Sequence, residues 1–181
     1  IKKSWISLFN INKNKDIIKN IFLKLNQELN QNIQFFPKYN DIFKCFTYFD
    51  INETKLVIVG QDPYYNEDKA NGLCFGTNNI HLPPTLKNII NNIKKNTNEN
   101  ITDYSLESWA KQNVLLINSA LTVVKNKPGS HMKLWKEFTD LIINELNNCD
   151  HSIIFVAWGA FDDKKLKNIN TNKHHLLITS H

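Results

Sequence analysis

Four short apolar runs are spaced along the chain, and each one ends close to glycine or polar residues. The runs occupy residues 55–59, 114–117, 153–157 and 176–178. An uninterrupted apolar run of this length is typical of a strand that is buried on both faces of a parallel sheet. We therefore predict four strands in one mostly parallel sheet.

Between these runs, apolar residues recur every three or four positions, which favours helices with one buried face. The predicted helical segments are 15–29, 40–48, 85–95, 105–112 and 134–146. Strands that alternate with helices indicate the α/β class. We expect a single three-layer α/β/α domain over residues 1–181, with a central, mostly parallel four-stranded sheet.

Composition agrees with a folded domain and restricts the kinds of partner. The 181 residues include 22 Lys, no Arg and 17 acidic residues, for a formal net charge of +5. This charge permits a polyanionic partner without identifying one. Asn, Lys and Ile make up 72 of the 181 residues. Because their codons are rich in adenine and thymine, a biased genome also explains many of the lysines.

The cysteines and the apolar runs indicate the redox state of the compartment and whether the chain enters a membrane. Cys45, Cys74 and Cys149 are widely spaced and form no CxxC pair, so we predict buried thiols in a reducing compartment. No apolar run approaches the roughly 18 residues that span a bilayer. The first residues show no signal-peptide pattern. We therefore expect no association with a membrane.

Polar side chains follow several of the predicted strands. Gln61 and Asp62 come after the first strand, Asn118 after the second, and His181 after the fourth. Because the carboxyl ends of parallel strands meet at one edge of a sheet, a carboxylate, a carboxamide and an imidazole should lie close together. The chain lacks glycine-rich nucleotide-binding loops, the HExxH metal motif and the GxSxG serine motif. We expect neither a metal nor a cofactor.

The same positions belong to a series of motifs that closely resembles family 1 uracil-DNA glycosylases. In family order, the motifs are GQDPY at 60–64, ANGLCF at 70–75, PPTLKNI at 83–89, LLINSALTV at 115–123, GSH at 129–131, WKEFTD at 135–140 and WG at 158–159. The match spans nearly the whole chain. The resemblance implies a parallel four-stranded sheet between helices. It also implies a DNA-repair enzyme that flips uracil out of DNA and hydrolyses the N-glycosidic bond, which leaves an abasic site.

Two residues match the catalytic groups of that family. Asp62 matches the aspartate that orients the attacking water and places negative charge near the cationic sugar. His181 matches the histidine that donates a hydrogen bond to the uracil oxygen as the base leaves. From the residues alone, Asp62 could also serve only as a turn carboxylate before Pro63. His181 could likewise be a terminal residue without a role.

Four further residues match the family's uracil pocket. Asn118 would pair with the carbonyl and the ring N–H of uracil, a pattern that cytosine cannot satisfy. Phe75 would stack on the base, and Tyr64 would fill the space that a thymine methyl group needs. Gln61 would contribute backbone hydrogen bonds. Without the resemblance, Asn118 could be interpreted as a turn residue at a strand end, and Phe75 as an aromatic residue of the core.

Contacts to the DNA backbone are assigned by the resemblance to loops that follow the pocket residues. Pro83, Pro84 and Thr85 match a proline-rich loop, in which Thr85 would hold a phosphate at the start of a helix. Gly159 matches the first residue of a glycine-serine loop that compresses the DNA strand. Helix capping and loop geometry are the alternative explanations for these residues.

The chain departs from the family pattern at three places. Tyr65 stands where the family usually has histidine, and Ala160 replaces the serine of the glycine-serine loop. Both changes are expected to weaken DNA contacts. The family also continues beyond the position of His181 with a loop that inserts into the minor groove, followed by a helix. A chain that lacks both should bind DNA and flip the base poorly.

The expected substrate is uracil-containing DNA, single- or double-stranded, bound by a monomer without metal. The resemblance places such an enzyme in the nucleus or another DNA-containing compartment. The alternative is a DNA-binding or replication-associated relative with weak or no turnover, which would tolerate the loss of His181. A nucleotide-binding protein of the Rossmann type is a distant third, since the glycine motifs are missing.

Overall fold

The computed structural model of the chain describes residues 1–67, 69–158 and 165–179. Its α-helices are α1 (Lys3–Phe9), α2 (Asn12–Asn30), α3 (Pro84–Thr97), α4 (Glu107–Ala110) and α5 (Met132–Asn147). Among these residues, no helix is long and apolar enough to cross a bilayer. The three long helices cover the predicted segments, and α4 is shorter than the predicted one.

The central sheet has four parallel strands, as predicted from the apolar runs. The strands are β2 (Leu56–Gly60), β3 (Val114–Asn118), β5 (Ile154–Trp158) and β6 (His175–Thr179). Their order across the sheet is β3-β2-β5-β6. In this register Gly60 lies opposite Asn118, so the carboxyl ends of β2 and β3 are level.

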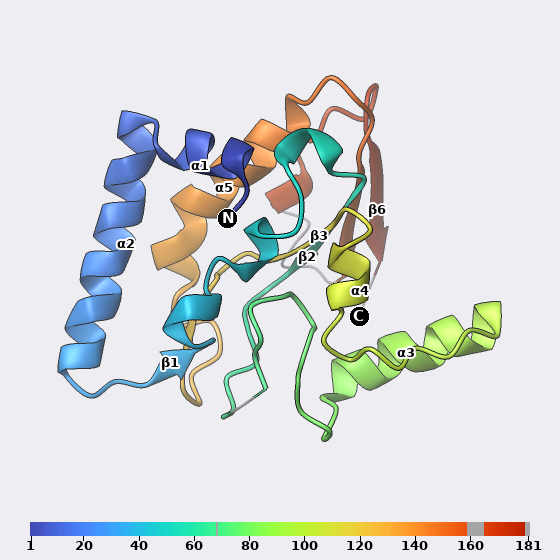
Figure 1. Cartoon of the computed structure of the whole chain (residues 1–181), viewed down its shortest axis with the longest axis horizontal. Helices are drawn as coiled ribbons and strands as arrows, with labels where there is room; N and C mark the ends of the chain where they lie inside the picture. Colours follow the sequence, from blue (N-terminus) through green and yellow to red (C-terminus); the bar gives the residue numbers. More distant parts are fainter. Residues whose placement is uncertain (68, 159–164, 180–181) are drawn as a thin grey trace.

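Helices pack against both faces of this sheet, which confirms the three-layer α/β/α prediction. In Figure 1, α2 and α5 lie on one side of the sheet, whereas α3 and α4 lie toward the other side. Phe138, Ile142 and Leu146 of α5 are buried in the core together with Phe155 of β5. Most polar residues of α2 face outward, as an amphipathic helix requires, but Asn14 and Glu28 are buried.

The predicted helix at 40–48 is wrong. The structure instead has two short 3₁₀ turns, Tyr39–Asp41 and Lys44–Phe46. Buried apolar residues of this segment do not keep one helical face, because Phe46 packs on the rings of Trp5 and Phe9 at centroid distances of 4.9 and 5.3 Å. Burial of these aromatic rings therefore decides the local backbone.

Two small features were not predicted. Helix α1 has only seven residues, and its Trp5 is fully buried and donates a hydrogen bond from Nε1 to the Phe49 carbonyl at 2.9 Å. A two-stranded antiparallel sheet joins β1 (Phe35–Phe36) to β4 (Val123–Val124). Strands of two residues are too short to leave a periodic pattern.

The cysteines have the state that the sequence predicted. Cys45, Cys74 and Cys149 are buried and form no disulfide bond. Burial raises the pKa of the Cys149 thiol, so this sulfur stays protonated at neutral pH. The three thiols therefore act as apolar core groups.

Candidate active site

A cavity of about 180 Å³ opens at the carboxyl ends of β2 and β3. Its walls are formed by Gln61, Asp62, Pro63, Tyr64, Tyr65, Ala70, Gly72, Leu73, Phe75, Thr85, Asn118 and Trp158. The volume suits one flat heterocycle. The fold thus brings together the predicted residues from the β2 loop, the β3 end and the start of α3.

The end of β2 must be glycine for this cavity to form. A Cβ atom at Gly60 would overlap Cys74 Sγ and would lie 2.6 Å from Asn118 Oδ1. Asn118 is the last residue of β3 and is only 7% exposed, so its amide has little room to move. Gly60 therefore keeps space for the carboxamide that faces the cavity.

We expect Gly60→Ala to lower the rate of uracil release by about tenfold or more and to destabilise the fold by about 1–3 kcal/mol, because overpacking moves the Asn118 amide. Single-turnover release and thermal unfolding measure the two effects. Ser7→Thr, which adds one methyl group at an exposed position of α1, is the control for added volume. Unchanged release in a folded Gly60→Ala protein would contradict the role given to this residue.

Backbone hydrogen bonds join the loops that follow β2 and β3. The Ser119 amide donates to the Gly60 carbonyl at 2.7 Å, and the Ala120 amide donates to the Gln61 carbonyl at 2.9 Å. These bonds extend the strand pairing beyond the sheet. They hold together the two loops whose residues Asp62 and Asn118 line the cavity.

Asp62 is half-buried at the rim of the cavity, and its carboxylate has a backbone partner. Gly129 donates its amide N–H to Asp62 Oδ2 at 2.5 Å. Burial raises the pKa of Asp62, while the hydrogen bond from Gly129 acts in the opposite direction. The net shift is upward, so Asp62 holds its charge less readily than a carboxylate in water.

This upward shift predicts a pH dependence. If the ionised carboxylate is the active form, uracil release should persist above the raised pKa and fall as the pH drops through it. The acid limb of kcat/KM, which reports the protein before it binds DNA, should therefore lie above the usual titration range of aspartate. Rates measured from pH 4 to 8 on the wild-type chain check this result, and a pH-independent residual rate is expected for Asp62→Asn. An acid limb at the ordinary aspartate value would contradict it.

Two aromatic residues, Tyr64 and Phe75, form part of the cavity wall. The Tyr64 hydroxyl donates to the Phe75 carbonyl at 2.9 Å, and burial raises the pKa of Tyr64, so it remains a neutral donor. Phe75 has a positive φ of 63°, an uncommon conformation for a residue with a side chain. Its ring lies 5.4 Å from that of Trp158, between centroids.

Trp158 was not predicted as a pocket residue. It is the last residue of β5 and lines the cavity next to Phe75. The signal was present in the sequence, because Trp158 directly follows the third buried run and begins the WG motif. Since the ring of Phe75 contacts it, Trp158 fixes one side of the stacking surface.

Of the predicted DNA-contact residues, some lie at the cavity or at the start of α3, and others lie outside the described part of the structure. Thr85 lines the cavity in the first turn of α3, where Pro83 is the N-cap residue and Pro84 begins the helix. Tyr65 is 41% exposed at the rim. The remaining predicted residues, which are Gly159, Ala160 and His181, lie outside the described part of the structure.

The described residues contain no group of three or more His, Cys, Asp or Glu side chains arranged to hold a metal ion. The side chains of the cavity supply a carboxylate, a carboxamide and aromatic surfaces. The fold and the cavity define an α/β protein with a cavity of the size of one nucleobase at the ends of two parallel strands.

Comparisons with known proteins identify the family. The profile of the uracil DNA glycosylase superfamily matches residues 46–181. A uracil-DNA glycosylase of Blochmanniella floridana is 41% identical over 184 residues, which cover 99% of this chain and 83% of the relative. The uracil-DNA glycosylase of Aliivibrio salmonicida is 38% identical, over 98% of this chain and 81% of its own. The crystal structure of mimivirus uracil-DNA glycosylase superposes with a TM-score of 0.92 at 30% identity, over 100% of this chain and 68% of that one.

The chain therefore belongs to the uracil DNA glycosylase superfamily. The two relatives compared by sequence come from bacteria, which have no nucleus, so they give the expected nuclear location no support. The four-stranded parallel sheet, shared with the mimivirus structure, agrees with what the apolar runs predicted.

Proposed function

We propose that this chain removes uracil from DNA by hydrolysing the bond between the base and the deoxyribose, as the first step of base excision repair. The observation that carries the proposal is the shared cavity of Asp62 and Asn118, which lie on walls that backbone hydrogen bonds hold together. Membership of the family supports the same reaction.

Recognition is assigned to three side chains of the cavity. The Asn118 carboxamide offers one donor and one acceptor to the edge of uracil, whereas cytosine presents an amino group where uracil has a carbonyl. Phe75 provides the stacking face. Tyr64, held by its bond to the Phe75 carbonyl, occupies the space that a 5-methyl group would require, so thymine is excluded by size.

Cleavage is assigned to Asp62 and His181. The C1′–N1 bond breaks with its electron pair going to uracil, and a water molecule adds to the sugar at C1′. Asp62 orients this water, faces the developing positive charge on the sugar and accepts the proton of the water. His181 is proposed to donate a hydrogen bond to the uracil oxygen on which negative charge develops.

DNA is held mainly through its backbone in this proposal. Pro83, Pro84 and Thr85 approach a phosphate at the N-terminal end of α3, where the helix dipole favours an anion. Tyr65 reaches a second phosphate or a water, and Gly159 and Ala160 contact the strand beside the lesion. With lysine as its only permanent cation, the protein binds phosphates as point charges, and binding weakens as salt rises. We propose a monomer that accepts single- and double-stranded DNA, in a compartment that contains DNA.

Release of free uracil tests the function. Oligonucleotides with one deoxyuridine, single- and double-stranded, are incubated with the 181-residue chain in EDTA, and the free base is quantified. Uracil release that depends on Asp62 supports the proposal, and matched oligonucleotides with thymidine or deoxycytidine are the controls. DNA binding without release would favour the alternative of a DNA-binding relative.

A further inference from the structure

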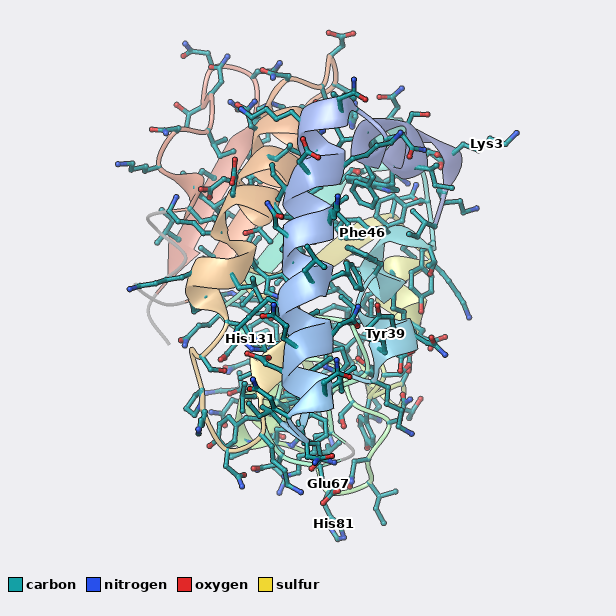
Figure 2. All side chains as sticks on the ribbon, turned by 90° about the vertical axis from the view of Figure 1, so that its left-hand side faces the viewer. Lys3, Tyr39, Phe46, Glu67, His81 and His131 are labelled. Atoms are coloured by element: carbon teal, nitrogen blue, oxygen red, sulfur yellow. The ribbon has the colours of Figure 1, made fainter. Side chains whose placement is uncertain are left out.

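A buried polar network lies outside the cavity and joins α2 to α5. His131 is 3% exposed and Glu28 is 6% exposed. The Nε2 atom of His131 lies 2.9 Å from Glu28 Oε2, and its Nδ1 atom lies 2.8 Å from Thr122 Oγ1. Trp135 donates from Nε1 to the same Thr122 oxygen at 2.6 Å. Figure 2 shows His131 beside the ribbon of α2.

Each hydrogen bond of this network has a defined direction. The indole of Trp135 can only donate, so Thr122 Oγ1 accepts from it and turns its own proton toward His131 Nδ1. His131 then carries its proton on Nε2 and donates it to the Glu28 carboxylate. Burial lowers the pKa of His131, against the opposing effect of Glu28, so the imidazole is neutral. With these directions, each of the four side chains has a hydrogen-bond partner.

The network holds together the two ends of segment 123–130, whose Gly129 contacts Asp62. Thr122 and His131 flank this segment, and the hydrogen bond between their side chains joins its two ends. Within the segment, the Val124 amide donates to Ser130 Oγ at 2.9 Å. The segment is thus a closed loop with a hydrogen bond across it, and the bond between His131 and Glu28 connects its end to α2.

Residues of the same segment also contact the loop that carries Asp62. Gly129 donates to the Asp62 carboxylate, and the Asn126 amide donates to the Tyr65 carbonyl at 3.1 Å. At the surface, Lys125 Nζ lies 3.2 Å from Glu67 Oε2. The loop after β2 therefore makes two hydrogen bonds and one ion pair with segment 123–130, and one of the hydrogen bonds is to the Asp62 carboxylate itself.

We propose that Glu28, His131 and Thr122 are positioning residues for uracil release, because they fix segment 123–130 so that the Gly129 N–H sets the orientation of the Asp62 carboxylate. This inference rests on the proposed function of Asp62. None of the three residues lines the cavity, so they act through Gly129 and not on the substrate. A carboxylate that rotates freely would spend less time in the orientation that holds the attacking water.

The test uses Glu28→Gln, which keeps the size of the side chain and removes its charge. We expect kcat for uracil release to fall about tenfold while KM for uracil-containing DNA stays within about twofold, because substrate contacts are untouched. Glu137→Gln, the same change at an exposed position of α5, should leave both parameters unchanged. Release by the wild-type chain and by this control establishes the proposed function separately from the positioning role.

A second pair of variants applies to the case in which Glu28→Gln does not fold. Thr122→Val removes the hydroxyl that links His131 to Trp135, and Thr122→Ser restores it. Thr122→Val should lower kcat about tenfold, and Thr122→Ser should recover most of the rate. Equal rates for the two folded variants would overturn the proposal.

The double variant separates positioning from general destabilisation. In the Asp62→Asn background, Glu28→Gln should lower the residual rate by less than about twofold, because the group that it positions is already gone. Amide hydrogen exchange provides a readout that does not depend on activity, and Gly129 should exchange at least about tenfold faster in Glu28→Gln than in Glu137→Gln. Equal rate losses in both backgrounds, or unchanged exchange at Gly129, would overturn the proposal.

Discussion

Asp62→Asn is expected to slow uracil release by about 10²- to 10⁴-fold, the range for loss of a positioned general base. Affinity for uracil-containing DNA should stay within about threefold, since asparagine keeps the shape of the side chain and its Oδ1 can still accept from Gly129. The substitution removes a negative charge that faces the positive sugar in the transition state. Single-turnover release and fluorescence anisotropy with the same oligonucleotide measure the two quantities.

The matched control is Asp16→Asn, the same change on the exposed face of α2, which should leave release unaltered.

The unfolding temperature of Asp62→Asn provides a second test. Because burial raises the pKa of Asp62, its charge costs stability above the ordinary aspartate pKa, so at pH 7 Asp62→Asn should unfold at the same or a higher temperature. Parallel losses of cleavage and DNA binding would count against the catalytic role.

Asn118→Ala is expected to lower kcat/KM for uracil release by about 10²- to 10³-fold, in line with the loss of preorganised hydrogen bonds at a reacting group. Without the carboxamide, the polar edge of the flipped base enters the cavity unpaired. The loss should appear with both single- and double-stranded DNA, because the pocket reads the flipped base in each case. Steady-state release at several DNA concentrations gives the value.

Asn144→Ala on the exposed face of α5 controls for the change in composition and should behave as the wild-type chain. Binding of DNA without uracil should be equal for wild type and Asn118→Ala, since this contact forms only after flipping. If Asn118→Ala released uracil at the wild-type rate, the recognition role of this residue would be wrong.

The sheet and the centre of the site were predictable because they depend on local patterns. Strands β2, β3 and β5 are largely buried, so their apolar runs are continuous, and parallel pairing then brings Asp62 and Asn118 to one edge. Strand β6 lies at the edge of the sheet, and its Leu177 and Ile178 are exposed although their run is equally apolar. The 3₁₀ turns before β2 were missed because ring contacts with α1, distant in sequence, shape that segment. The short apolar pairs on either side of Lys44 are compatible with a helix or a turn.

The positioning network was not predictable for a different reason. Glu28 and His131 are 103 residues apart, and Glu28 lies among polar residues in a helix, where a carboxylate normally faces water. Only the packing of α2 against the start of α5 buries the pair. The role of Trp158 was not predictable either, because a tryptophan after an apolar strand is normally assigned to the core until the cavity beside it is known.

The pairing of β2 with β3 has a consequence for events after cleavage. The hydrogen bonds from Ser119 to Gly60 and from Ala120 to Gln61 join backbone atoms of the chain to each other, so the shape of the cavity is set by the protein itself. If these walls fit uracil in the strand, they should also fit the free base. We therefore expect released uracil to compete with the next lesion for the same space, so that clearance of the free base keeps repair at its full rate.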